Sequence, residues 1–344
     1  MGNTRRHGFI TGGTWCVDYN RMVTHWPEED GIAQVVEEER HGGGSGCNFA
    51  LDIKRLDPDM PVETITITGD DEAGRFLRSL AAGAGIGHDQ MHLTAEASTQ
   101  WTDAFISKAS GRRTHIFNSG ASTFLTPDHF DFSLSSARYL HLGLPGVHQQ
   151  LDGPWQGDVN GWVTVLKRAR AEGLKTNLEL ASIDREQLAN LVRPCLPHLD
   201  LIIVNDSEIG ALSGMDTLPG GVTDISACER AARHVLEKGV MEFVVVHWPT
   251  GAIAVTRDGS IFTKPSTQIP RSVIASANGA GDAFAAGMLY GLHEGWRIDE
   301  ALTLAHASAA ASLRSLSTTG AVESWRKCLE LAGLWGWRTQ VAPP

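Results

Sequence analysis

The chain has 344 residues, with 40 acidic against 29 basic side chains and a formal net charge of −11. This acidic balance argues against binding to nucleic acid or to an anionic membrane, because both need a basic surface that neutralises phosphates. No run of about 18 apolar residues occurs, as a membrane-spanning helix would need, and the five cysteines lack C-x-x-C spacing. We therefore expect a cytoplasmic protein with reduced thiols.

Apolar runs of strand length alternate with helical patterns along most of the chain. Several runs are apolar throughout, which is typical of parallel strands covered on both faces. The alternation predicts an α/β fold, with a doubly wound, mostly parallel sheet flanked by helices in a single domain over 1–344. The predicted strands are 7–13, 62–68, 139–145, 174–180, 199–205 and 242–248, and the predicted helices are 47–56, 71–82, 158–172, 184–193, 226–238 and 298–315.

Two segments interrupt this alternation. Residues 14–41 contain two short β-like runs around a Pro-Glu-Glu-Asp-Gly turn, and residues 99–120 contain two more around a Ser-Gly turn. Both are predicted to be hairpins inserted into the α/β body. Together they could form a small β-sheet that acts as a lid.

The segment 276–292 carries the sharpest chemical pattern. Gly279, Ala280 and Gly281 precede Asp282 and a helical run of small residues. Small residues let the first N–H groups of a helix face an anion, and the helix dipole favours negative charge there. Asp282 would then be placed to take a proton from a hydroxyl that attacks a phosphoryl group. An aspartate in the first turn of an ordinary helix is also common, so the segment alone leaves both interpretations open.

A glycine-rich stretch at 41–56 precedes another predicted helix. Gly43 and Gly44 permit close approach to the backbone, and Asn48 follows on the first turn. An Asn side chain both donates and accepts hydrogen bonds, which suits sugar hydroxyls. A flexible turn before a helix capped by Ser45 is the simpler alternative.

Asn205 and Glu208 follow the most apolar strand. Ligands of doubly wound sheets bind outside the carboxyl ends of the strands. Oxygen ligands from these two side chains could hold a hydrated Mg²⁺ ion. The same pair could instead only cap the following helix.

In this order and spacing the segments resemble the PfkB/ribokinase family of carbohydrate and nucleoside kinases, over about residues 8–332. The resemblance implies ATP-dependent phosphorylation of a hydroxyl on a sugar or sugar-like molecule. It also implies that the hairpins form a lid, which some members use for a homodimer. The implied roles are substrate binding for Asp18, Gly43, Gly44 and Asn48; Mg²⁺ and nucleotide binding for Asn205 and Glu208; an anion hole for Gly279, Ala280 and Gly281; and the catalytic base for Asp282.

The chain departs from the family pattern at two places. The family usually has Asp-Thr where this chain has Ser276-Ala277, and that pair helps ribokinase-like members to bind a monovalent cation. A Gly-x-x-Gly turn usually follows the nucleotide strand, whereas here Trp248 replaces the first glycine and Gly251 is kept. Trp248 would either obstruct the nucleotide or pack beside it.

Other function classes fit less well. A dinucleotide-dependent oxidoreductase would need G-x-G-x-x-G after the first strand, and a P-loop kinase would need Gly-Lys-Ser/Thr; neither occurs. Two alternatives remain, an adenosine-type nucleoside kinase and a catalytically weakened sugar-binding relative. Asp18, Asn48 and Glu179, the last at a strand end, suggest several substrate hydroxyls without identifying the substrate.

Overall fold

The computed structural model describes residues 6–110 and 112–339; Gly111, inside the predicted 99–120 hairpin, lies outside them. The strands are β1 (Phe9–Gly13), β2 (Cys16–Val23), β3 (Val35–Gly43), β4 (Val62–Gly69), β5 (Gly87–Thr94), β6 (Trp101–Ser107), β7 (Arg113–Asn118), β8 (Tyr139–Gly143), β9 (Lys175–Leu178), β10 (Leu201–Asn205), β11 (Phe243–Trp248), β12 (Gly251–Thr256) and β13 (Ile261–Pro265). The helices are α1 (Ser45–Leu56), α2 (Glu72–Gly83), α3 (Gln149–Asp152), α4 (Gly161–Ala171), α5 (Arg185–Val192), α6 (Asp206–Ser213), α7 (Ile225–Glu237), α8 (Ala280–His293), α9 (Ile298–Ser312) and α10 (Trp325–Trp335).

The body is built around a long, mostly parallel sheet. Five strands pair in the order β5-β4-β1-β8-β9, and every pair is parallel. The order β10-β11-β12-β13 continues this arrangement, because the Asp200 N–H beside β10 bonds to the Thr176 carbonyl of β9 at 3.1 Å. The pairing of β10 with β11 is parallel, whereas β12 and β13 are antiparallel additions. The predicted α/β fold with a mostly parallel sheet is therefore confirmed.

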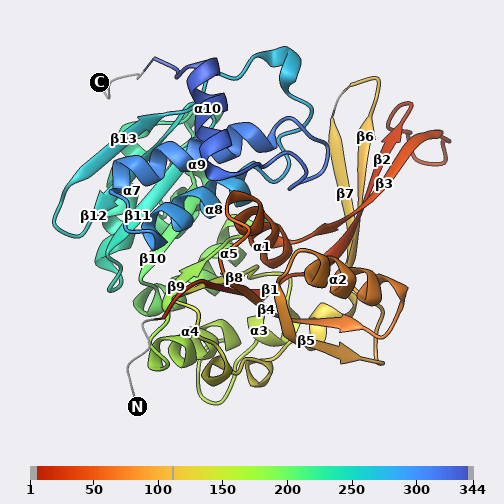
Figure 1. Ribbon diagram of the computed structural model, residues 1–344, viewed down its shortest axis with the longest axis horizontal. Helices are drawn as coiled ribbons and strands as arrows, with labels where there is room; N and C mark the ends of the chain where they lie inside the picture. Colours follow the sequence, from red (N-terminus) through yellow and green to blue (C-terminus); the bar gives the residue numbers. More distant parts are fainter. Residues whose placement is uncertain (1–5, 111, 340–344) are drawn as a thin grey trace.

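The central strands are buried on both faces, which explains their unbroken apolar sequences. In β10, Ile202 and Val204 pack in the core formed with α4, α5, α6 and α7. Leu201 and Ile203 point the other way, into the core formed with α1, α8, α9 and α10. Figure 1 shows α8, α9 and α10 above the sheet and α3 and α4 below it. The side-chain alternation of a strand thus supplies two separate cores.

The two predicted hairpins form one small sheet of order β3-β2-β6-β7. Each hairpin pairs antiparallel within itself, and the parallel pairing of β2 with β6 joins them. The sheet extends from the right-hand side of the body in Figure 1. We refer to it below as the lid sheet.

Strands β5, β12 and β13 are not among the predicted elements; β12 is buried along most of its length, whereas β5 and β13 bury little. In β5 only Met91 is buried, and in β13 no residue is. Edge strands of this kind bury too little to carry a clear apolar pattern. Within the described part of the chain, no helix is both long and apolar enough to cross a bilayer.

Candidate active site

Helix α8 begins at the edge of the sheet where the parallel strands end. Its N-cap residue, Gly279, has a left-handed backbone with φ 78°. A Cβ atom at Gly279 would lie 2.4 Å from the carbonyl oxygen of Thr318, so the position requires glycine on both grounds. The first-turn N–H groups, from Ala280 to Asp282, have no partner within the helix. This geometry creates a site where the backbone can face an anion.

Asn48 and Asp282, 234 residues apart in the sequence, are hydrogen-bonded to each other. The Asn48 Nδ2 donates to Asp282 Oδ2 at 3.1 Å. The Thr318 hydroxyl donates to Asn48 Oδ1 at 2.8 Å, which directs the amide N–H₂ toward the carboxylate. Helix packing between α1 and α8 therefore joins the two sequence segments that carry the glycine-rich patterns.

Asp18 and the glycine pair of β3 also come together. A Cβ atom at Gly43 would lie 2.0 Å from Asp18 Oδ2, so the carboxylate occupies the space that any other residue would fill. Gly44 is the N-cap of α1 and has φ 87°. Burial is the main cause that raises the pKa of Cys47, and the charges of Asp18 and Asp282 both add to it, so both carboxylates lie near this thiol.

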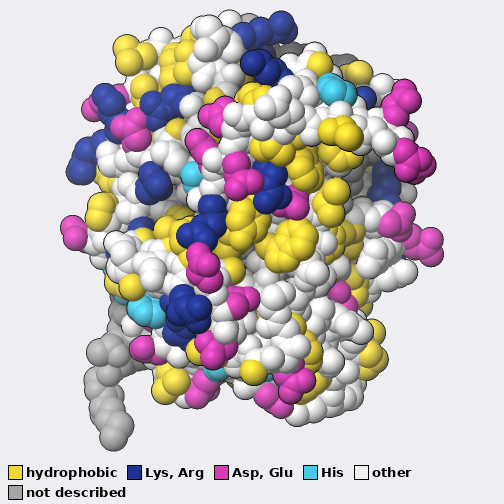
Figure 2. Space-filling view, turned by 90° about the vertical axis from the view of Figure 1, so that its right-hand side faces the viewer, with side chains coloured by type: hydrophobic (Ala, Val, Ile, Leu, Met, Phe, Trp, Pro, Cys, Tyr) yellow, Lys and Arg dark blue, Asp and Glu magenta, His cyan; other side chains and the backbone are white. Residues whose placement is uncertain are grey.

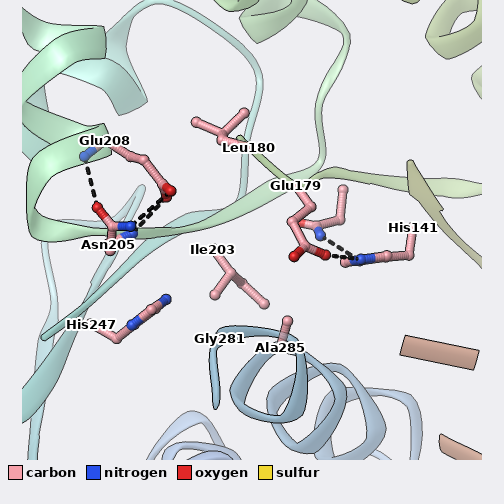
Figure 3. A pocket seen from close by; sticks show the side chains of 10 residues that line it. His141, Glu179, Leu180, Ile203, Asn205, Glu208, His247, Gly281 and Ala285 are labelled. Atoms are coloured by element: carbon pink, nitrogen blue, oxygen red, sulfur yellow. Dashed lines mark hydrogen bonds and ion pairs between the residues drawn. The ribbon is translucent and has the colours of Figure 1, made fainter. Parts of the chain in front are cut away.

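A second carboxyl group, that of Glu179, lies beside Asp282. Glu179 directly follows β9, and its carboxylate is hydrogen-bonded to the ring of His141 (Figure 3). A side-chain hydrogen bond also links Glu179 to Asp282. The Asn177 amide in turn donates to His141 Nδ1 at 3.0 Å. Sequence reasoning named Glu179 only as a hydroxyl contact and missed His141 and Asn177. The signal that could have identified His141 and Asn177 is that each is a polar residue inside a predicted strand.

Asn205 and Glu208 form a reciprocal cap at the start of α6. Asn205 Oδ1 accepts from the Glu208 N–H at 2.9 Å, while the Glu208 carboxylate accepts from the Asn205 backbone N–H and side-chain amide at 2.9 and 2.7 Å. The simpler interpretation of this pair is thus present in the structure. Each carboxylate oxygen keeps a free lone pair, and both side chains border a cavity that Gly281 also lines. Oxygen donors in this setting fit a hydrated Mg²⁺ ion.

A cavity of about 540 Å³ lies on the other side of the α8 N-terminus. Asn205, Ala280 and Gly281 line its polar end, and mostly apolar side chains enclose the rest. Trp248 forms part of its wall and is buried, so the indole packs beside the cavity without filling it. Ala277, at the first departure from the family pattern, also lines this cavity. Gly251 lines a smaller neighbouring cavity together with Trp248.

The chain is similar to known proteins over most of its length. Residues 11–325 match a family model described as pfkB family carbohydrate kinase. A 5-dehydro-2-deoxygluconokinase of Geobacillus thermodenitrificans is 26% identical over 91% of this chain and 89% of its own length. An adenosine kinase of Schizosaccharomyces pombe is 32% identical over 37% of this chain and 36% of its own. The structure of Arabidopsis thaliana ribokinase with ribose and ATP superposes with a TM-score of 0.78 at 19% identity, covering 95% of this chain and 99% of that one.

Replacing Gly279 should test whether its close contact with Thr318 shapes the helix start. Gly279→Ala combines a left-handed backbone with a collision, whereas Gly295→Ala has a similar φ of 77° and open space around the new Cβ. The Gly295 variant should lose about 1–2 kcal/mol in free energy of unfolding from backbone strain alone. Gly279→Ala should lose about 1–3 kcal/mol more, because the contact must open. Urea denaturation of both variants measures the difference, and equal losses would contradict the role given to Thr318.

Proposed function

Because the chain belongs to the pfkB family of carbohydrate kinases, we propose that it transfers a phosphoryl group from ATP to a hydroxyl of a sugar or sugar-like small molecule. The observation that best supports this activity is the position of Asp282, which lies in the first turn of α8 beside the unpaired backbone N–H groups. A proton acceptor and an anion site are thereby adjacent. Both are needed where an alcohol attacks a phosphoryl group.

Each residue at the start of α8 then has a separate task. Asp282 takes the proton of the acceptor hydroxyl, and the N–H groups of Ala280 and Gly281 donate to the oxygens of the phosphoryl group in transfer. Asn48 holds the Asp282 carboxylate in place through its 3.1 Å hydrogen bond. Such fixed donors stabilise charge without reorganising during the reaction.

The cavity of about 540 Å³ is the proposed ATP site, since it opens beside the same N–H groups. Its size and apolar walls suit a flat aromatic base, with the polar end facing the phosphates. Asn205 and Glu208 would hold Mg²⁺, which when bound neutralises phosphate charge. The open cavity beside Trp248 favours an active kinase over a sugar-binding relative that has lost nucleotide binding.

The polar side chains near Asp282, where the acceptor would bind, favour a substrate with several hydroxyl groups. Asp18, Asn48 and Glu179 present oxygen and amide groups near the base. A nucleoside remains the second candidate, because adenosine kinases are among the similar proteins. Both candidates share the same transfer chemistry and differ only in the acceptor.

Measuring ATP consumption with a library of sugars, sugar acids and nucleosides tests this function directly. At least one member should become phosphorylated. Asp282→Asn should reduce kcat by about 10²–10⁴-fold, because the amide cannot accept the hydroxyl proton. Its binding of the identified acceptor, measured by calorimetry, should stay within a few fold of the unmodified protein.

Asp152→Asn is a useful comparison, because Asp152 is a partly buried carboxylate that accepts from the indole N–H of Trp162 at 2.8 Å and lines neither of the two cavities at the start of α8. It should retain far more activity than Asp282→Asn. An Asp282→Asn protein with unreduced kcat would refute the role of the base. Acceptor binding without any phosphoryl transfer by the unmodified protein would favour the sugar-binding alternative.

We further propose that the lid sheet forms a homodimer contact. Apolar side chains are exposed on both of its hairpins, and Figure 2, which looks onto this side of the molecule, shows hydrophobic side chains gathered near its centre. Exposed apolar groups gathered in this way are typical of protein interfaces. The exposed apolar residues of the hairpins are Trp26, Ile32, Val35, Val36, Ile116 and Phe117.

Phe117→Glu should convert such a dimer to monomers, because a charge would be buried in the contact. Phe117 is 54% exposed in the single chain, so the substitution should leave the fold intact. Leu334→Glu, at a residue that is 79% exposed on α10, is the control and should stay dimeric. Light scattering after size exclusion gives both masses. A monomeric unmodified protein would contradict the proposal.

A further inference from the structure

The close approach of Glu179 to Asp282 has no part in the mechanism so far. We propose that the two side chains form a carboxyl pair that takes up a single shared proton, and that Glu179 is a positioning residue whose negative charge strengthens Asp282 as the base for the acceptor hydroxyl. This inference rests on the proposed kinase function for its catalytic meaning. The pair itself rests on the contacts around the two side chains.

One oxygen of Glu179 is fixed by a buried imidazole. Asn177 donates its amide hydrogen to His141 Nδ1, so the ring hydrogen must lie on Nε2 and be donated to Glu179 Oε2. The His141 ring is fully buried and stacks on Phe49 with ring centres 4.0 Å apart. Burial lowers the pKa of His141 to about 3, so the ring is a neutral donor. The second oxygen of Glu179 remains available to Asp282.

The Asp282 carboxylate is held in the same way from the opposite side. Asn48 donates to its Oδ2, and a hydrogen bond links Asp282 to Glu179. Two enclosed carboxyl groups that are hydrogen-bonded to each other cannot both ionise without strong repulsion, so below the pKa of the pair a proton between them is the favoured state. In agreement, burial raises the pKa of Glu179 to about 7, and burial followed by the Glu179 charge raises the pKa of Asp282 well above its usual value.

Among the described residues that act on Glu179 and Asp282, none supplies a positive charge that would compensate two carboxylates. Asp52 is fully buried and neither of its oxygens has a hydrogen-bond partner, so its raised pKa keeps it protonated. Glu208 faces Glu179 across the cavity (Figure 3) and adds negative charge. Burial lowers the pKa of His247 to about 4, so that ring is neutral. The titratable groups facing the pair are Cys47 and Asp52 from α1, His141 from β8, Glu208 from α6 and His247 from β11.

The proton balance follows from the pair. In the reactive form the pair has lost its shared proton, so Glu179 and Asp282 are both ionised. The acceptor O–H bond breaks as its proton moves to Asp282, while the acceptor oxygen bonds to phosphorus and the bond to the leaving ADP oxygen breaks. The pair then holds this one proton, shared between the two carboxyl groups, and releases it to solvent before the next cycle. Like charge nearby makes Asp282 a stronger base than an isolated aspartate.

Glu179→Gln tests the pair with little change in shape. The amide oxygen still accepts from His141 and the amide N–H₂ can donate to Asp282, but the carboxyl group is gone. The pKa of Asp282 should fall, so the acid limb of the kcat profile should move to lower pH, by on the order of one unit. The plateau kcat should also fall, because Asp282 becomes a weaker base. A purely structural role would lower kcat without moving the limb.

Glu186→Gln is the matched control, because Glu186 is an exposed carboxylate on α5, seven residues after Glu179 in the sequence, and lines neither cavity at the start of α8. Its acid limb should coincide with that of the unmodified protein. Glu179→Asp withdraws the carboxyl by one methylene and should move the limb in the same direction as Glu179→Gln, to a smaller extent. An acid limb unmoved in both Glu179 variants would overturn the proposal.

Thermal unfolding gives a readout that does not need activity. The folded pKa of Glu179, about 7, lies above the unfolded value, so the bound proton stabilises the fold fully below about pH 4. This contribution is lost as pH rises through the folded pKa. The Tm of Glu179→Gln should therefore rise relative to that of the unmodified protein between about pH 5 and about pH 8. A Tm difference between Glu179→Gln and the unmodified protein that does not change with pH would overturn the carboxyl pair. If this difference rises with pH but the protein phosphorylates no library member, the pair stands and the kinase proposal is refuted.

Discussion

A helix that starts where parallel strands end is the constraint on which the candidate site depends. The strands β1, β8, β10 and β11 run in one direction, so their carboxyl ends share one edge of the sheet. Helix α8 begins at that edge with Gly279 in a conformation that other residues adopt only under strain. The unpaired N–H groups, the aspartate of the first turn and the large cavity all take their positions from this one helix start. A shift of α8 along its axis would displace all three together.

Several acidic side chains lie close to this helix start, and burial makes their ionised forms unfavourable. Asp52, Glu179, Glu208 and Asp282 all have raised pKa values, and burial is the largest cause for each. The helix N-terminus and the amides of Asn48 and Asn205 offset part of this cost. Because raised pKa values keep protons on these carboxyl groups, the region carries less negative charge, which would weaken its repulsion of the proposed triphosphate. The protons on these buried carboxyl groups therefore affect both the stability of the fold and the proposed proton transfer.

The sequence predicted the body and the lid sheet because both rest on local patterns. Buried strands such as β10 are apolar throughout, and the hairpins are marked by their turns. The edge strands β5 and β13 lack that pattern because they bury little. At the site, the segments around Asn48, Asn205 and Asp282 were found from glycine spacing and strand ends, and their individual roles remain predictions. The His141–Glu179–Asp282 chain could not be found, because its members are brought together only by the packing of β8, β9 and α8.

The connection between the lid sheet and α1 is unusually short. Strand β3 ends at Gly43 and α1 begins at Ser45, so Gly44 alone separates them. Its φ of 87° turns the chain sharply from the lid into the helix that carries Asn48. Any rotation of β3 about Gly44 would therefore be passed directly to the helix that carries Asn48. In this architecture, enclosing a bound molecule and aligning the proposed proton acceptor would be one movement.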